Sequence, residues 1–366
     1  MSNTFGNQIK ITLFGESHGP KIGAVIDGLT PGIFVSQEKI KECLSLRRPS
    51  GSHETSRVEN DEFEIISGVF NNYTTGAPLC ILIKNGDVHS SDYEINKSLA
   101  RPSHADYVAH EKYHGFEDYR GGGHFSGRIT AAIVAAGAIV LQALEKVGIN
   151  IATHILQCGS ISDRNFENIN EDIKYLRNKS FPVLNDIEDV CLEEINKARL
   201  EQDSIGGITE TVINNLPVGI GEPWFDSLEG SLSQAIFGIG GIKGIQFGAG
   251  FNFASMKGSE ANDCFYIDDK KVKTLSNNNG GINGGISNGM PIVFSCAIRP
   301  TPSIAKAQKT IDIDKKEDAS IEIVGRHDPA IIRRICIVIT CMTALVIADQ
   351  LAVKYGKDVF LKEKLD

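Results

Sequence analysis

The chain lacks the excess of basic residues that nucleic acids and anionic membrane surfaces attract. Its 366 residues include 37 lysines and arginines against 46 aspartates and glutamates, which gives a net charge of -9. Binding to a nucleic acid draws much of its free energy from counterions displaced by a broad basic surface. The composition therefore argues against a nucleic-acid or membrane partner and favours a small-molecule substrate. A basic pocket on an acidic body stays compatible with it.

The chain also has no Cys-x-x-Cys pair and no signal-like N-terminus. Its eight cysteines are scattered and several lie in apolar runs, so we interpret them as small buried hydrophobic residues in a reducing compartment. No cationic segment followed by an apolar one opens the sequence. The most apolar stretch, residues 335–348, is shorter than the roughly 18 residues that suggest a membrane span, and it predicts a buried helix. We therefore expect a cytoplasmic protein.

Neither of the two common nucleotide-binding loops is present. Residues 121–127, 238–244 and 280–289 are rich in glycine, but none fits a Walker A loop or a Gly-x-Gly-x-x-Gly turn between a strand and a helix. Exposed amides in such stretches can hold a phosphate or the edge of a flat ring, and tight turns between strands are an equally good interpretation. No set of histidine and acidic residues has the spacing of metal ligands, so we expect no metal site.

What the sequence does contain is a mixture of short apolar runs and helical segments. Ser36 is suited to cap a helix that has Glu38 in its first turn, and residues 128–147 are rich in alanine, which allows close packing. This mixture predicts an α+β fold in one domain over residues 1–366, with a peripheral excursion at the polar residues 160–186. Both halves combine strands, helices and glycine turns, which allows an internal pseudo-duplication, although no clean repeat is visible. Strands are expected at 8–14, 23–26, 79–83, 208–213, 244–247 and 290–298, and helices at 36–46, 128–147 and 227–237.

Three titratable residues stand in unusual local contexts. His18 lies between small residues in Gly15-Glu16-Ser17-His18-Gly19, directly after an apolar run, and His104 lies in Arg101-Pro102-Ser103-His104-Ala105-Asp106. Imidazole titrates at about 6.5, so both could act as general acids. Asp328, in Gly325-Arg326-His327-Asp328-Pro329, could be the base, and the alternative that His327 is the reactive group stays open. The sequence gives no such context to His154, which we expect to be a surface or structural residue.

Arginines gather near the glycine-rich stretches and near these histidines. The planar guanidinium group matches carboxylate and phosphate geometry. Eight arginines in glycine, serine and proline contexts favour a small polyanionic ligand; they are Arg47, Arg48, Arg101, Arg120, Arg128, Arg299, Arg326 and Arg334.

Taken together, these motifs resemble those of chorismate synthases, and the resemblance runs in order from about residue 5 to residue 355. It is carried by residues 15–19 with Asp27-Gly28, by Ser126-Gly127-Arg128, and by residues 325–329. Between them lie further matching stretches at residues 101–107, 203–207, 217–223, 284–289 and 299–303.

The resemblance implies a β-α-β sandwich, usually assembled as a homotetramer, and a lyase of the shikimate pathway of aromatic amino acid biosynthesis. The implied reaction is the anti-1,4-elimination of phosphate and a ring proton from 5-enolpyruvylshikimate 3-phosphate, which gives chorismate. Such enzymes require reduced FMN without net redox change, and NADPH is a candidate reductant. By this analogy His18 would protonate the departing phosphate and His104 would favour the anionic reduced flavin. Asp328 would help the flavin N5 take the substrate proton.

The same resemblance assigns binding roles. Arg47 and His53 fall where the family binds NADP or the substrate phosphate, and Arg48, Arg128 and Arg334 are further candidates for the anionic substrate. Expected FMN contacts are His124, Phe125, Ser126, Gly240, Gly241, Gly284, Arg299, Pro300, Thr301, Pro302, Ser303 and Arg326.

The chain departs from the family pattern at a few positions. His53 stands where an arginine is common, Ser50 interrupts a usual Pro-Gly, and Gly240-Gly241 replaces a bulkier pair. Thr340 takes the place of a usual glutamate, so a buried polar contact could be missing there. Two rival functions stay open. A flavin-dependent oxidoreductase on the same scaffold would show net oxidation, and a non-catalytic anion-binding protein would have no need for His18, His104 and Asp328.

Overall fold

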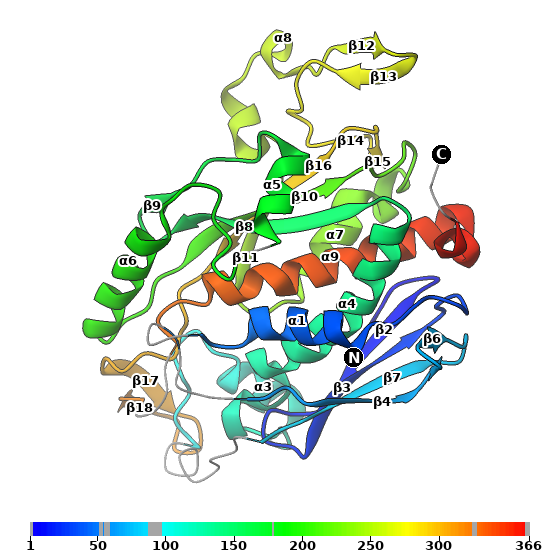
Figure 1. Cartoon of the computed structure of the whole chain (residues 1–366). Coiled ribbons are helices and arrows are strands. Elements are labelled where there is room, and N and C mark those ends of the chain that lie inside the picture. The colour runs from blue at the N-terminus through cyan, green and yellow to red at the C-terminus, as the bar shows by residue number, and fades with distance from the viewer. Residues whose placement is uncertain are drawn as a thin grey trace.

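Two five-stranded antiparallel sheets enclose a layer of helices in this computed structural model (Figure 1). The structure describes residues 3–50, 54, 59–86, 97–177, 179–323 and 328–362. The first sheet has the order β1-β2-β3-β7-β4, with strands Thr4–Phe5, Lys10–Phe14, Lys21–Asp27, Leu79–Lys84 and Phe63–Ser67. The second has the order β11-β16-β10-β8-β9, with strands Ile242–Phe247, Ile292–Ile298, Gly207–Asn214, Asn150–Cys158 and Ile161–Ser162.

The remaining elements are helices and short hairpins. The α-helices are α1 (Gln37–Arg47), α3 (Asp106–Tyr113), α4 (Thr130–Lys146), α5 (Ile169–Leu176), α6 (Glu188–Leu200), α7 (Leu228–Phe237), α8 (Gly258–Ala261) and α9 (Ile332–Tyr355). Short 3-10 turns are η1 (Arg120–Phe125), η2 (Gly127–Ile129), η3 (Trp224–Asp226), η4 (Gly250–Ser255) and η5 (Lys357–Leu361). The hairpins are β5–β6 (Val69–Phe70, Tyr73–Thr74), β12–β13 (Phe265–Asp268, Lys271–Thr274), β14–β15 (Ile282–Asn283, Ile286–Ser287) and β17–β18 (Gln308–Asp312, Glu317–Ile321).

The helices α4 and α9 form the middle of the molecule. They pack against each other, α1 packs on both, α4 covers β3 and β7 of the first sheet, and α9 covers β8 and β10 of the second (Figure 1). The close approach of α4 and α9 depends on a glycine, because a Cβ atom on Gly137 would lie 2.5 Å from Cβ of Cys341. The predicted α+β fold with a β-α-β sandwich is confirmed.

The last helix is longer than its apolar run predicts. It spans 24 residues because Asp349 and Gln350 are buried within it, where Asp349 accepts hydrogen bonds from the backbone amides of residues 7–9 at 2.6–2.9 Å. Among the described residues, Gly127–Lys146 and Ile332–Tyr355 are long and apolar enough to cross a membrane by length and composition. However, 83% and 94% of their apolar windows are buried inside the fold, as is usual for core helices.

The two halves of the chain repeat an order of elements. In the first half β3, α1, β4, β7 and α4 follow one another, and in the second half β10, α7, β11, β16 and α9 do the same, with smaller elements inserted. In each sheet the strand that precedes the helix, β3 in the first half and β10 in the second, is central, and the two strands that follow the helix lie on one side of it. The other side differs between the sheets. The second strand of the first sheet, β2, neighbours β3, whereas the first strand of the second sheet, β8, neighbours β10. This order supports the internal pseudo-duplication.

Local expectations agree with the structure to within a few residues. Ser36 caps α1 by accepting from the Lys39 amide at 3.2 Å, and six of the eight cysteines are buried, while Cys80 is partly exposed and Cys264 exposed. Residues 160–186 hold β9 and α5, and the glycine-rich stretch 280–289 contains the hairpin β14–β15. The sequence analysis did not predict α3 or α6. Both are charged helices that bury few residues, so neither carries a strong apolar periodicity.

Candidate active site

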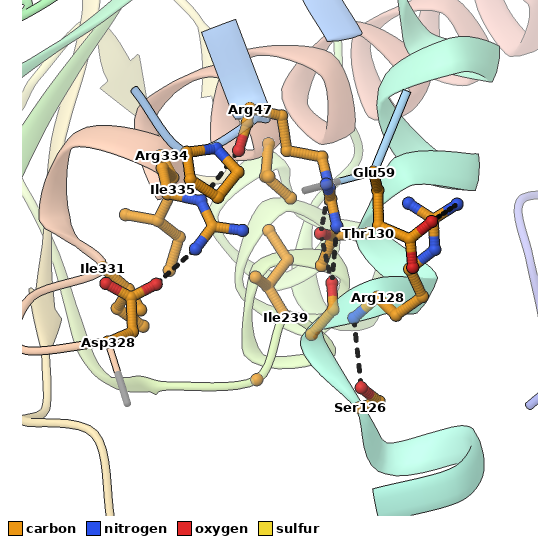
Figure 2. A pocket seen from close by; sticks show the side chains of 14 residues that line it. Arg47, Glu59, Ser126, Arg128, Thr130, Ile239, Asp328, Ile331, Arg334 and Ile335 are labelled. Carbon is orange, nitrogen blue, oxygen red and sulfur yellow. Dashed lines mark hydrogen bonds and ion pairs between the residues drawn. The ribbon is translucent and has the colours of Figure 1, made fainter. Parts of the chain in front are cut away.

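A cavity of about 260 Å³ opens where four helices begin or end. The helices α4 and α9 start at it, and α1 and α7 end at it (Figure 2). A helix N-terminus carries partial positive charge and unpaired amide groups, so two of these four ends favour an anion. The lining residues are Arg47, Pro49, Glu59, Ser126, Gly127, Arg128, Thr130, Ile239, Gly240, Asp328, Ile331, Arg334, Ile335 and Val338.

Two buried arginines on one wall share a carboxylate. Arg47 lies 3.4 Å from one Asp61 oxygen and donates from Nε to Thr130 Oγ1 at 3.0 Å, while Arg128 forms a short ion pair with the other Asp61 oxygen. Glu59 approaches Arg128 at 3.9 Å. The Asp61 side chain is fully buried. We call Arg47, Glu59, Asp61 and Arg128 the arginine cluster. Its carboxylates hold the guanidinium groups in place, and they also offset part of the positive charge.

Asp328 lies across the cavity from this cluster and pairs with Arg334 through Oδ2 (Figure 2). Its Oδ1 is buried and has no hydrogen-bond partner among the described residues. Burial raises the pKa of Asp328 above its ordinary value, and Arg334 opposes this only in part. The carboxyl group is therefore poised to hold a proton more readily than an exposed aspartate.

Arginines at the start of α9 also bind the end of α1. Arg334 Nε donates to the Arg47 carbonyl at 2.8 Å. Arg333 donates to the carbonyls of Leu46 at 3.1 Å and Arg48 at 2.5 Å, and it forms a two-pronged ion pair with Glu54. Guanidinium groups placed on the last carbonyls of a helix complement its negative end. Arg48 itself, expected to contact substrate, points to the Asn60 carbonyl and is not part of the cavity lining.

The histidines His18 and His104 meet at one glycine-rich turn rather than in this cavity. A Cβ atom on Gly121 would lie 2.2 Å from Cε1 of His18, and one on Gly122 would lie 3.1 Å from Cε1 of His104. Both glycines have positive φ angles of 59° and 81°. A side chain at either position would displace an imidazole, so the turn needs glycine for space as well as for its backbone conformation. The same segment continues through Gly123 to Ser126 and Arg128 at the cavity.

His104 is oriented by an acidic neighbour. Its Nδ1 lies 2.6 Å from Asp106 Oδ1, and Arg101 pairs with the same carboxylate at 2.7 Å. Burial acts to raise the pKa of Asp106, but hydrogen bonds from Arg101 and His104 outweigh burial and hold it well below its ordinary value. A carboxylate at Nδ1 fixes the tautomer in which that nitrogen carries hydrogen. Nε2, on the side of Gly122, is then free to accept a proton.

The stretch 299–303 connects both groups of residues. The Arg299 side chain donates to the Ser103 carbonyl at 2.6 Å, and its amide donates to Gly241 at 2.9 Å. Thr301 Oγ1 donates to the Asp328 carbonyl at 2.6 Å. The stretch 299–303, which is predicted to bind FMN, therefore joins the segment of His104 to the segment of Asp328.

The other predicted residues are placed as follows. His124 Nδ1 donates to the Gly15 carbonyl at 2.8 Å, and Phe125 is 43% exposed. Ser126 and Gly240 line the cavity, and a Cβ at Gly240 would meet no atom within 4 Å, so the small residue there leaves the cavity wide. Gly284 lies in the β14–β15 turn, outside the lining. Pro300, Pro302 and Ser303 complete the 299–303 stretch, and His53, His327 and Arg326 lie outside the described residues.

Four residues were not predicted from the sequence: Glu59, Asp61, Asn85 and Arg333. Glu59, Asp61 and Arg333 stand in no glycine or proline motif, and Asn85-Gly86 follows an apolar run, where this pair indicates only a turn. The role of each depends on a partner that lies far away in the chain. Thr340 is not left without a polar contact, because its hydroxyl bonds to Thr153 Oγ1 at 2.8 Å. Within the described ranges, no group of three or more histidine, cysteine or acidic residues could hold a metal ion.

Known proteins resemble this chain over nearly its whole length. The family model "Chorismate synthase" matches residues 9–352. The chorismate synthase of Korarchaeum cryptofilum (strain OPF8) is 43% identical over 95% of this chain and 96% of its own length. That of Dehalococcoides mccartyi (strain BAV1) is 45% identical over 97% and 98%. A crystal structure of chorismate synthase superposes with a TM-score of 0.75 at 26% identity, covering 98% of this chain and 96% of that one. The chain belongs to the chorismate synthase family.

Proposed function

We propose that this lyase converts 5-enolpyruvylshikimate 3-phosphate into chorismate and phosphate by anti-1,4-elimination. One C–O bond to phosphate and one C–H bond break, and a new C=C bond forms. One observation carries the proposal: a cavity at the N-termini of two long helices, lined by Arg47, Arg128, Arg334 and Asp328, adjoins the turn that holds both histidines. Family membership favours this lyase over a flavin-dependent oxidoreductase.

The cavity is built for a ligand with several negative charges. The proposed substrate carries a phosphate and two carboxylates, and guanidinium groups bind such anions through paired N–H donors. Arg47 and Arg334 line the cavity, and hydrogen bonds with neighbouring residues hold each guanidinium in place there (Figure 2). The cations stabilise the charge that builds on the leaving oxygens, and most strongly where water is excluded. The family resemblance assigns Arg48 and His53 to the proposed anion or NADP site.

His18 is proposed as the proton donor to the departing phosphate. The side chain is 8% exposed and sits on the hairpin loop between β2 and β3, against Gly121. A histidine can be protonated near neutral pH and give up that proton in the reaction. His104, with its Nδ1 hydrogen held by Asp106, offers Nε2 toward the same turn. Two imidazoles, each of which can carry a proton, therefore lie against the same glycine segment.

The residues on this turn fit a flavin. Gly121, Gly122 and Gly123 all have positive φ, and the imidazoles of His18 and His104 lie directly against the first two. Phe125 offers an exposed ring, and Asp328 Oδ1 is a buried acceptor with capacity for a donor. We propose that these residues hold FMN together with His124, Ser126, Gly240, Gly241, Gly284, Arg299–Ser303 and Arg326. When bound and reduced, FMN supplies a reversible electron source, so that no net oxidation results, and NADPH is the candidate reductant.

Asp328 is proposed to hold a proton at the edge of the cavity. Its raised pKa and its ion pair with Arg334 suit a carboxyl group that takes up a proton during the reaction and releases it afterwards.

Exposed apolar side chains support assembly into a homotetramer. Phe251, Phe265 and Leu275, on and beside the β12–β13 arm, are 83%, 65% and 74% exposed, and Trp224 and Phe225 in η3 are exposed as well. Exposed apolar groups gathered in this way commonly mark surfaces between subunits. We propose that the tetramer acts in the cytoplasm.

An anaerobic assay tests the function directly. The enzyme, FMN and 5-enolpyruvylshikimate 3-phosphate are mixed with dithionite or with NADPH, and chorismate absorbance is followed. Many turnovers per reduced flavin are expected, without stoichiometric consumption of reductant. Reductant consumed one for one with product would favour the oxidoreductase, and absence of chorismate with reduced flavin would refute the proposal. Activity with NADPH alone would show that the enzyme reduces its own flavin.

A further inference from the structure

The side chain of Asn85 connects the loop that carries His18 to the wall of the cavity. Its Nδ2 donates to the carbonyl oxygens of Glu16 at 3.0 Å and Gly19 at 2.7 Å. Its Oδ1 accepts from Arg128 Nε at 3.0 Å. These partners determine which amide atom is which, because carbonyl oxygens only accept hydrogen bonds and a guanidinium only donates them.

Strand register places Asn85 at this junction. The hairpin of β2 and β3 pairs Phe14 with Gly23, so the chain between the strands forms the loop with His18. On the other side of β3, Lys21 pairs with Lys84, the last residue of β7. Asn85 is therefore the first residue beyond the sheet on that side, next to the loop.

We propose that Asn85 is a positioning residue for the reaction, which holds the His18 loop in register with Arg128. Its two carbonyl partners, Glu16 and Gly19, stand on either side of His18 in the chain, so the amide holds the loop before and after His18. We call this pair of hydrogen bonds the clamp. Arg128 in turn is held by Asp61 and by the Lys84 carbonyl at 2.9 Å. This inference rests on the proposed role of His18 as proton donor.

Other hydrogen bonds hold the loop besides the clamp, among them the bond from His124 Nδ1 to the Gly15 carbonyl. The Ser17 amide donates to the Gly123 carbonyl at 3.0 Å, and the Gly19 amide donates to Glu16 at 3.1 Å. Without Asn85 the loop keeps these bonds but loses its connection to the arginine wall. A small displacement of a proton donor lowers turnover strongly, whereas it affects substrate binding little.

A double-mutant cycle tests this role. Asn85→Ala is expected to lower kcat roughly 10- to 100-fold, with little change in KM for the substrate or in FMN affinity. In the His18→Ala background the same substitution should cause no further loss, because its effect passes through His18. The same fold-loss in both backgrounds would overturn the proposal.

Two further variants distinguish the loss of the hydrogen bonds from Asn85 to the loop from general damage to the fold. Asn85→Asp keeps an acceptor for Arg128 but cannot donate to the two carbonyls, so it should lose kcat as Asn85→Ala does; wild-type kcat would overturn the proposal. Asn278 is a matched control, since its Nδ2 donates to the carbonyls of Glu260 and Ala261 at 3.3 and 3.2 Å, away from the cavity. Asn278→Ala should leave kcat unchanged.

Amide hydrogen exchange gives a readout that needs no turnover. In Asn85→Ala the amides of Ser17 and Gly19 should exchange faster than in the wild type, and in Asn278→Ala they should not. Unchanged exchange in Asn85→Ala would refute the clamp. If the wild-type enzyme made no chorismate, the proposed function would fail while this measurement still decided whether Asn85 positions the loop.

Discussion

The arginine cluster at the cavity and a second cluster on the second sheet are both buried and both contain paired charges. In the second, the histidine cluster, His154 lies 3.1 Å from Glu210 and 3.7 Å from Asp163. Backbone amides satisfy these carboxylates: Phe166 donates to Glu210 at 2.8 Å, and Leu184 donates to Asp163 at 2.5 Å. The histidine cluster thereby closes on itself and fastens residues 163–185 to the sheet.

The arginine cluster differs because its guanidinium groups border empty space. Arg47 and Arg128 line the cavity, whereas His154 is fully buried and lines none of it. Both clusters contain perturbed or paired charges, so these properties alone do not mark an active site. What separates the two is room for a ligand beside the charges.

The largest expected effect is on turnover, and it concerns His18, on the loop that lies against the glycine turn beside the cavity. His18→Ala should lower kcat by roughly 10²–10⁴, the usual effect of losing a general acid, and leave FMN binding largely intact. Steady-state kinetics and FMN titration measure both. His154→Phe is the control and should keep kcat. Wild-type turnover in His18→Ala would remove His18 from the reaction.

A smaller effect is expected from the shared carboxylate of the arginine cluster. Asp61→Ala leaves two buried guanidinium groups without their partner, which should lower the free energy of unfolding by about 3–5 kcal/mol. The loosened arginines should also raise KM for the substrate. Denaturant unfolding and kinetics measure the two effects, and Asp61→Asn, which keeps an acceptor, should lose less. An unchanged denaturant midpoint of unfolding in Asp61→Ala would show that this residue does not hold the cluster together.

In the histidine cluster only stability should change. His154→Phe keeps an aromatic ring against Phe166 but removes the hydrogen bond to a charged partner, Glu210, which should cost about 1.5–3 kcal/mol. A loss of kcat at unchanged stability would contradict the structural role.

The difference in unfolding free energy between the wild type and His154→Phe should depend on pH. Burial acts to lower the pKa of His154, but the carboxylates of Asp163 and Glu210 outweigh it and raise the pKa above its ordinary value. Such a group stabilises the fold fully below its unfolded pKa of about 6.5, and this contribution is lost as pH rises through the folded pKa. The gap between the wild type and His154→Phe should therefore be largest at pH 6 and shrink at higher pH. A gap independent of pH would mean that folding does not shift the pKa of His154, and a gap that shrinks as the pH falls would mean that His154 stays neutral in the fold.

The smallest expected effect is at Thr340 on α9. Thr340→Val removes one buried hydrogen bond to Thr153, which retains its bond to Thr211 at 3.0 Å. The expected cost is about 0.5–1.5 kcal/mol in unfolding free energy, with kcat unchanged. Thermal and denaturant unfolding measure it. A marked loss of activity would place α9 closer to the chemistry than its contacts indicate.

Much of the fold was predictable from local patterns. The Ser36 cap and the alanine-rich helix α4 depend on neighbours within a few residues, and both were predicted. The full length of α9 was not, because burying Asp349 requires amides that lie more than 300 residues away. His18, His104 and Asp328 were found because glycine or proline lies within two residues of each of them, in a motif that matches the family. Asp61 has no such neighbour, and the pair Asn85-Gly86 indicates only a turn.

The sequence by itself determined which chemical groups are available: two histidines in glycine-rich or proline-containing motifs, a set of arginines, and an aspartate next to proline. It also determined the secondary structure that carries most of them, because caps, turns and apolar periodicity are local properties. Only the tertiary structure decided that the histidines share one turn, that Asp61 holds two arginines, and that Asn85 joins the two regions. Such choices depend on strand register and on helix ends meeting in space, and no short stretch of sequence contains them.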